Sequence, residues 1–157
     1  DHTLRLIKQN AERLHQAEKI SLTKLDARQS FETFGADRCD KILVDAPCSG
    51  LGLIRRKPDI KYRKETTDFE NLQKVQLEIL ENTCKTLVNS GIIVYSTCTI
   101  FDEENFQVIE KFLAKHPEFV QVPLTHEKAD IVKNGCLMIT PDAYHTDGFF
   151  IAKLCKK

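Results

Sequence analysis

The chain has 157 residues, of which 41% are hydrophobic, enough for one core and too few to argue for two. Its 23 basic and 23 acidic side chains cancel, so no overall field favours nucleic acid or a membrane, and any attraction must be local. No apolar run approaches the roughly 18 to 20 residues that span a bilayer, and the first residues have no signal-peptide character, so we expect one cytoplasmic domain without a membrane partner. The six cysteines form no C-x-x-C pair and no zinc-ligand spacing, which indicates reduced thiols and no metal site.

An amphipathic helix and a short strand are the first predicted elements. Residues 3–14 place their apolar side chains on one helical face, namely Leu4, Ile7, Ala11 and Leu14. This spacing predicts a surface helix that covers a sheet. Ile20 to Leu25 is typical of a short strand ending at Asp26. An acid at a strand end can bind a ligand, or it can cap or salt-bridge a neighbouring turn, and for Asp26 the residues alone favour the turn.

Two later segments echo each other: KILVDAPCSG at Lys41 to Gly50 and GIIVYSTCT at Gly91 to Thr99. In each, an apolar run of strand length ends in small and polar residues with a cysteine at the exit. Such continuous runs are typical of parallel strands buried on both faces, and ligand crevices lie beyond the carboxyl ends of such strands. We therefore predict one site that holds Asp45, Cys48 and Cys98 together.

Positive charge is concentrated in the segment after Gly50. Within ten positions, and opposed there only by Asp59, this segment holds six basic residues and a tyrosine, namely Arg55, Arg56, Lys57, Lys61, Tyr62, Arg63 and Lys64. Guanidinium groups and an aromatic ring suit phosphates and unstacked bases. A charge run is more often a solvated loop, but this one begins at the exit of the Asp45 strand, so we predict that it binds RNA.

The rest of the chain alternates helices and strands. A capping box at Thr67 to Glu70 opens a long packing helix over residues 67–88, which Asn89, Ser90 and Gly91 end. The strand at 92–95 leads to the second cysteine. A second helix is predicted at about 102–115, and three late strands are predicted at 118–122, 136–140 and 149–154.

These motifs carry a resemblance to a known family. DAPCSG, then G-x-I-R-R-x-P-D-I-K, then YSTCT with EEN soon after, and finally TDGFF-x-A-K-L resemble the Nol/Nop/Sun family of RNA 5-methylcytosine methyltransferases over essentially the whole chain. The resemblance implies an α/β fold, a Rossmann-like class I methyltransferase sheet. It also implies transfer of a methyl group from S-adenosylmethionine to C5 of a cytosine in ribosomal RNA.

The family pattern implies a role for each residue of the predicted site. Cys98 attacks C6 of the cytosine as a thiolate, the form that must be populated for this chemistry. Asp45 contacts N3 and the exocyclic amine, Pro47 holds the strand exit rigid, and Cys48 assists when the C5 proton is lost and the adduct eliminates. DNA cytosine methyltransferases use a cysteine after proline, the position of Cys48, so the opposite assignment stays open. The target base must leave its stack to reach these groups.

The cofactor side of the resemblance is less complete. It implies contacts with S-adenosylmethionine from Asp1, Asp26, Asp45 and Pro47, with Asp26 near the adenine. No G-x-G or Gly-Gly occurs among the six glycines, so the family's glycine-rich cofactor loop is not found. We therefore expect residues 1–157 to be the C-terminal portion of one methyltransferase catalytic domain, truncated at its N-terminal strands, with an incomplete cofactor site.

This truncation predicts an unfilled place in the sheet. The family's sheet has two further strands between the counterparts of 20–25 and 41–44. Either the first segment closes onto the edge of the second, or another chain fills the gap, or an N-terminal half has been lost; an exposed edge favours a homodimer. Two functions follow: the catalytic part of an enzyme that methylates cytosine in ribosomal RNA, or an incomplete fragment acting at most as an RNA-binding or interaction module.

Overall fold

The computed structural model describes residues 2–62 and 66–157. Its α-helices are α1 (His2–Arg13), α2 (Ser30–Phe34), α3 (Thr66–Thr83), α4 (Phe106–Lys115) and α5 (Pro141–Tyr144). Its strands are β1 (Cys39–Asp45), β2 (Leu87–Thr97), β3 (Phe119–Gln121), β4 (Val132–Lys133), β5 (Cys136–Ile139) and β6 (Phe149–Lys156). Short 3-10 helices are η1 (Ala17–Lys19), η2 (Ala27–Gln29), η3 (Leu51–Leu53), η4 (Pro58–Tyr62), η5 (Cys84–Thr86), η6 (Asp102–Glu104) and η7 (Ala129–Ile131).

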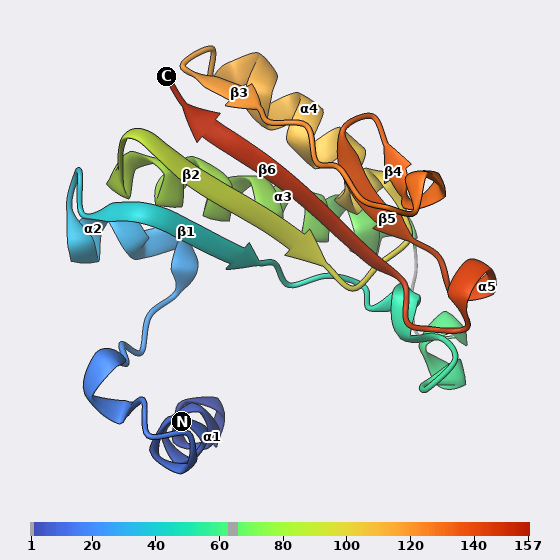
Figure 1. Cartoon of the computed structure of the whole chain (residues 1–157), viewed down its shortest axis with the longest axis horizontal. Coiled ribbons are helices and arrows are strands. Elements are labelled where there is room, and N and C mark those ends of the chain that lie inside the picture. Colours follow the sequence, from blue (N-terminus) through green and yellow to red (C-terminus); the bar gives the residue numbers. More distant parts are fainter. Residues whose placement is uncertain (1, 63–65) are drawn as a thin grey trace.

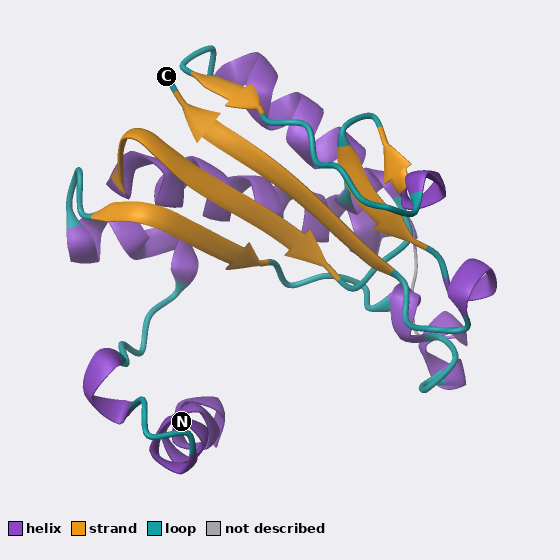
Figure 2. Cartoon of the chain, in the orientation of Figure 1, coloured by secondary structure: helices purple, strands orange, loops and turns teal. Residues whose placement is uncertain are grey.

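All six strands belong to one mixed sheet (Figure 2). The order is β1-β2-β6-β5-β4, and β3 also pairs with β6. β1 and β2 are parallel, whereas β6 is antiparallel to β2. β3 pairs with one end of β6 and β5 with the other, so two short strands share its outer edge. This is the predicted α/β arrangement, and it places the carboxyl ends of β1 and β2 side by side.

The core lies between the sheet and two helices, α3 and α4, which both lie behind the sheet in Figure 1. Alternate strand residues point into this core, among them Ile93 and Tyr95 of β2, which are fully buried. Burial on both faces, as predicted for these strands, is wrong for β1: Leu43 is 70% exposed. The reason is that α1, predicted to cover a sheet, contributes no such layer.

The N-terminal segment, residues 2–29, is mostly set apart from the sheet (Figure 1). α1 forms as predicted and buries Ala11, but its side chains Leu6 and Ile7 are exposed, as is Leu14 just beyond its end. The predicted strand at 20–25 is also wrong, because this stretch is extended coil. A strand is stable only when its backbone groups pair with a neighbour. Among the described residues none pairs with the outer edge of β1, and the predicted homodimer through this edge stays a prediction.

The end of the long helix differs from its prediction. α3 stops at Thr83, and Asn89 to Gly91, predicted to end the helix, instead lie within β2. The strand starts early because Leu87, fully buried, already pairs with Cys39 of β1. The ladder is irregular between this pair and the next, and Ser90 has a positive φ of 61° there. The second helix and the three late strands are confirmed within a few residues, while α2, β4 and α5 were not predicted.

No described helix combines the length and the apolar character needed to cross a bilayer.

Candidate active site

The ends of β1 and β2 bring the two predicted cysteines into contact. The parallel register makes Asp45 the partner of Ser96, and the N–H of Ala46 donates to the carbonyl of Ser96 at 2.9 Å. Beyond this pair the Sγ atoms of Cys48 and Cys98 lie 3.2 Å apart, within hydrogen-bond distance. The structure therefore gathers both thiols at the strand ends where the sequence placed them.

Burial and the neighbouring sulfur change the acidity of the Cys48 thiol. Cys48 has its pKa raised from 9.0 to about 12, first by burial and then by the hydrogen bond and charge of the Cys98 sulfur. At neutral pH a thiol with such a pKa stays protonated. Cys48 can thus donate its proton toward the sulfur of Cys98.

Asp45 lies at the same strand end with its side chain exposed. One of its oxygens, Oδ1, accepts a hydrogen bond of 3.0 Å from the Ser96 hydroxyl. Pro47 is exposed as well, and its carbonyl accepts a 2.8 Å bond from Gln76 of α3. Both residues therefore face solvent next to the open edge of β1.

A fully buried carboxylate, Glu104, supports the two cysteine loops from beneath. It accepts hydrogen bonds from the Ser49 backbone N–H at 2.8 Å and from the Ser49 hydroxyl at 2.5 Å. That hydroxyl also lies 3.0 Å from the hydroxyl of Thr99. The residues following the two cysteines are thus tied to each other and to one acid.

Asn105, also fully buried, holds the Cys98 loop on both sides. Its Oδ1 accepts from the Thr97 hydroxyl at 2.5 Å, and its Nδ2 donates to the Thr99 carbonyl at 3.0 Å. Glu104 and Asn105 were not predicted as site residues, because they fall at the start of the helix predicted at about 102–115. The signal that pointed to them was the EEN motif so soon after YSTCT.

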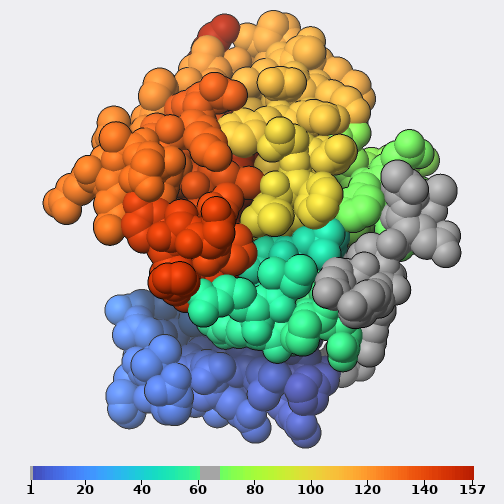
Figure 3. Space-filling model, turned by 90° about the vertical axis from the view of Figure 1, so that its right-hand side faces the viewer, coloured from blue at the N-terminus to red at the C-terminus, as the bar shows by residue number. Residues whose placement is uncertain are grey.

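Two glycines let three loops meet at the site. A Cβ on Gly52 would lie 2.3 Å from the Gly148 carbonyl oxygen and 2.7 Å from that of Cys98. The N–H of Gly52 donates to the Cys98 carbonyl at 2.9 Å, and the N–H of Gly148 donates to the Gly52 carbonyl at 2.8 Å. Figure 3 shows the same junction from outside, with the segments near residues 55, 100 and 145 adjoining on one face.

The predicted RNA-binding loop begins at this junction. Arg55 and Lys57 are exposed, whereas Arg56 makes a 2.7 Å ion pair with Asp147 in the turn before β6. A hollow of about 400 Å³ lies along 56–60. The other residues predicted here are not described: Arg63 and Lys64 lie outside the described residues, as do the side chains of Lys61 and Tyr62.

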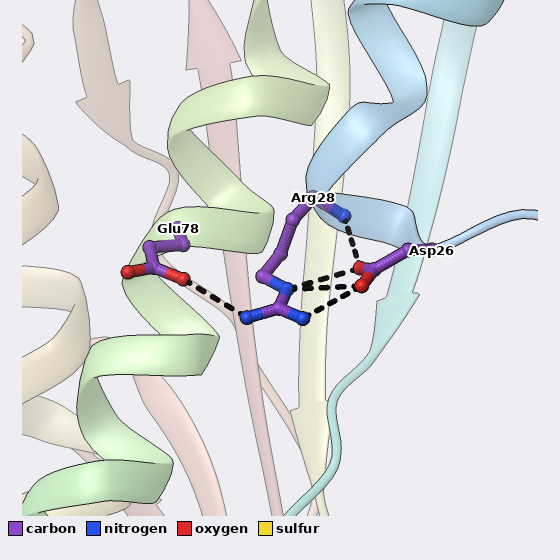
Figure 4. A network of polar contacts seen from close by, with 3 residues as sticks. All are labelled: Asp26, Arg28 and Glu78. Carbon is purple, nitrogen blue, oxygen red and sulfur yellow. Dashed lines mark hydrogen bonds and ion pairs between the residues drawn. The ribbon is translucent and has the colours of Figure 1, made fainter.

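Asp26, the predicted adenine-side acid, is held by a neighbour (Figure 4). It caps η2 by accepting from the backbone N–H of Arg28 at 3.0 Å, and the guanidinium of Arg28 contacts both of its oxygens, the shorter distance being 2.7 Å. These bonds lower the pKa of Asp26 from 3.8 to about 2. The same arginine reaches Glu78 of α3 at 3.5 Å. Asp1, the other predicted cofactor acid, lies outside the described residues.

The mixed α/β sheet, in which the antiparallel β6 lies beside the parallel pair β1 and β2, is the fold of a Rossmann-like methyltransferase. The sequence profile described as 16S rRNA methyltransferase RsmB/F matches residues 1–155, and the chain belongs to this family. The predicted membership of the Nol/Nop/Sun methyltransferases is thereby confirmed.

One similar protein is the probable ribosomal RNA small subunit methyltransferase B of Bacillus subtilis, which is 43% identical over 161 residues. That match takes in 99% of this chain and 36% of the relative, so the chain spans about a third of the length of such relatives.

Solved structures agree on the fold. The crystal structure of PH0851 has a TM-score of 0.80 and 33% identity, with 93% of this chain and 35% of that one covered. NSun6 from Pyrococcus horikoshii with SFG has a TM-score of 0.70 and 28% identity, covering 92% and 39%. The predicted fold class is confirmed.

Proposed function

We propose that these residues form the cytosine-facing part of an S-adenosylmethionine-dependent enzyme that methylates C5 of a cytosine in ribosomal RNA through a covalent cysteine adduct. The observation that carries the proposal is the 3.2 Å separation of the Cys48 and Cys98 sulfurs at the ends of two parallel strands. Family membership and the name of the Bacillus relative support ribosomal RNA as substrate.

The chemistry assigned to the two strand ends starts at Cys98. C5 of cytosine is not nucleophilic until the ring is activated, so the Cys98 thiolate forms a bond to C6 and pushes electron density toward C5 and N3. Asp45 contacts N3 and the exocyclic amine as this density moves. Once C5 carries the methyl group, its proton leaves and the bond between sulfur and C6 breaks, which restores the aromatic ring and the thiolate.

Cys48 is suited to the second half of this sequence. Part of the rise in its pKa comes from the hydrogen bond and charge of Cys98. When Cys98 is a thioether on C6, its charge is gone and only burial still raises the pKa of Cys48. Cys48 therefore becomes more acidic, and more often a thiolate, at the stage when a proton has to leave C5.

The cofactor supplies an electrophilic methyl group when bound. Asp45 and Pro47 fit it, because they are exposed where β1 ends and its outer edge is open. Asp26 fits only if Arg28 gives way, since the guanidinium already contacts both carboxylate oxygens. SFG, an analogue of S-adenosylmethionine, accompanies the related NSun6 structure and supports this choice of cofactor.

The RNA is proposed to pass over the basic loop. Arg55 and Lys57 are exposed for phosphate contacts, while Arg56, through Asp147, fixes the loop against the turn that precedes β6. Arg55, the first basic residue of this loop, comes seven positions after Cys48, so we expect an RNA backbone held there to run close to the base that reacts.

The test is a covalent-adduct assay in the protein at the length of its relatives, with substrate RNA and S-adenosylmethionine. Cys48→Ala should accumulate an RNA adduct that survives denaturation, because the adduct forms and does not eliminate. Cys98→Ala should form none. In the Cys48→Ala background, Arg55→Glu with Lys57→Glu should raise the RNA concentration needed for half-maximal adduct by at least about tenfold, since phosphate contacts supply much of the affinity.

The outcomes separate the alternatives. An adduct with Cys98→Ala and none with Cys48→Ala would reverse the two roles. If neither variant nor the unaltered protein forms an adduct or methylates the RNA, the enzymatic proposal fails and a binding module is left. The same adduct yield from Arg55/Lys57 variants at every RNA concentration would remove the basic loop from the proposal.

A further inference from the structure

We infer that Glu104 is the positioning residue of the thiol pair: its buried carboxylate fixes the residues that follow both cysteines, and thereby keeps the two sulfurs within hydrogen-bond distance. The inference rests on the proposed function for its catalytic consequence, but the geometry that it explains can be measured without any methylation.

Glu104 bonds directly to the Cys48 loop. Both carboxylate oxygens of Glu104 are used, one by the backbone N–H and the other by the hydroxyl of Ser49. A carboxylate that receives both donors of one residue fixes the position and the orientation of that residue. Because Ser49 directly follows Cys48, the direction of the Cys48 side chain is fixed as well.

A relay of hydrogen bonds connects Glu104 to the Cys98 loop. The Ser49 hydroxyl is shared between Glu104 and the hydroxyl of Thr99, at 2.5 and 3.0 Å. Ser49, Thr99 and Glu104 are all buried, so these bonds are made away from water, where a missing partner is costly. Asn105, the residue after Glu104, donates from its side-chain amide to the Thr99 carbonyl, so two consecutive residues hold this loop, one through Ser49 and one directly.

Gln76 of α3 holds both Glu104 and the Cys48 loop. The Nε2 of Gln76, fully buried, donates to the Pro47 carbonyl at 2.8 Å and to Glu104 at 3.1 Å. Pro47 precedes Cys48, so the Cys48 loop is held on both sides of the thiol. Neither bond survives if the amide is turned, because its oxygen would then face two acceptors. The polar residue on the packing face of α3 is thus explained by the site.

The exposed neighbour Glu103 provides a matched control. It lies on the same 3-10 turn with its side chain in solvent, so Glu103→Ala makes the same chemical change without touching either loop. Glu104→Gln is the conservative variant. Its amide oxygen accepts from Ser49 N–H and Gln76, and its amide N–H donates to the Ser49 hydroxyl, which then turns its own hydrogen toward Thr99.

The first measurement is the rate at which oxidised glutathione converts the chain to a Cys48–Cys98 disulfide, with two reduced glutathione molecules as the other product. Peptide mass spectrometry follows the loss of two hydrogens. Glu104→Ala should slow this step by about 10-fold or more, because a misplacement near 1 Å is expected to cost up to about 100-fold in a reaction that depends on aligned atoms. Glu103→Ala and Glu104→Gln should react at rates close to that of the unaltered chain.

Ser49→Ala covers the case in which Glu104→Ala does not fold. It removes only the hydroxyl relay and leaves the Ser49 backbone bond to Glu104 in place. We expect a smaller slowing than for Glu104→Ala, and a similar slowing for Thr99→Val, because each cuts the same link. Equal rates for Ser49→Ala, Thr99→Val and the unaltered chain would remove the relay from the inference.

The second measurement is RNA methylation in the protein at the length of its relatives. Glu104→Ala should lower kcat with little change in the KM for RNA, and Glu104→Gln should restore kcat. If Glu104→Gln is as damaging as Glu104→Ala in both assays, the charge matters and positioning is overturned. If the disulfide rates follow the expected order but the unaltered protein does not methylate RNA, the proposed function fails and the positioning role stands.

Discussion

Burial differs between two regions of the molecule, the carboxyl ends of β1 and β2 and the N-terminal segment, residues 2–29. The first region buries polar side chains, and the second exposes apolar ones. Near the strand ends, the polar side chains of Glu104 and Asn105 are fully buried; Glu104 bonds twice to Ser49, and Asn105 bonds to Thr97 and Thr99. In the N-terminal segment the amphipathic helix α1 forms as predicted, yet it buries only Ala11, and Leu14 just beyond its end is 56% exposed. Periodicity thus predicts an element, whereas burial depends on a partner surface that the element must reach.

The largest effect on stability should come from truncating a side chain in the core. Leu80 of α3 is fully buried, so Leu80→Ala should lower the free energy of unfolding by about 2–5 kcal/mol through lost burial and a residual cavity. Leu14→Ala, the same change just beyond the end of α1, should alter it by less than about 0.5 kcal/mol. Urea titration followed by circular dichroism measures both. Equal losses would mean that the face of α1 is covered in solution.

An intermediate effect should come from the loop junction at Gly52. Gly52→Ala should destabilise the protein by about 1–3 kcal/mol, because its Cβ would lie 2.3 Å from the Gly148 carbonyl oxygen and the backbone must shift. It should also slow Cys48–Cys98 disulfide formation, since Gly52 bonds to the Cys98 carbonyl.

Gly35→Ala is the control for this substitution. Gly35 has a positive φ of 77°, and a Cβ added there would meet no described neighbour within 4 Å. The change should therefore cost about 1–3 kcal/mol of backbone strain, because a φ of 77° with a ψ of −176° is adopted essentially by glycine alone, and leave the disulfide rate unchanged. A Gly52→Ala protein that oxidises as fast as the Gly35→Ala protein would show that the loop junction does not position the thiols.

The backbone of the candidate site was largely predictable from sequence, because it depends on local patterns. The strand exits at Asp45 and Cys98 are specified by apolar runs that end in small polar residues, and parallel pairing then brings them together. The helix that carries Gln76 was predicted, but the bond from Gln76 to Glu104 was not, because it depends on how α3 and η6 meet. Such long-range polar contacts leave no periodic signal.

The N-terminal segment was predictable only in part, for the complementary reason. Its helix depends on local spacing and was placed within a residue or two, whereas the strand at 20–25 depends on a neighbouring strand and did not form. The outer edge of β1 is unpaired and Leu43 is exposed for the same reason: in sheets of this type a further strand or helical layer covers such surfaces.

The smallest effect concerns the ion pair at the border of the N-terminal segment. The pKa of Asp26 is lowered to about 2, chiefly by the side-chain hydrogen bond of Arg28, so Arg28→Gln should return it toward 3.8 while Arg13→Gln should not. A folded-state pKa below the unfolded value means that the stabilisation is present above about pH 4 and is lost as pH falls through about 2. NMR titration of the Asp26 carboxyl carbon measures the midpoint in each variant.

Added salt provides a further test of the ion pair between Asp26 and Arg28. Because Asp26 and Arg28 are exposed, added salt should raise the midpoint toward its ordinary value, which a buried pair would resist. A midpoint near 3.8 in the unaltered protein would mean that Arg28 does not hold the carboxylate in solution. Asp26 would then be available to a ligand from the start, and the N-terminal segment would lack the contact through which Arg28 joins it to Glu78 of α3.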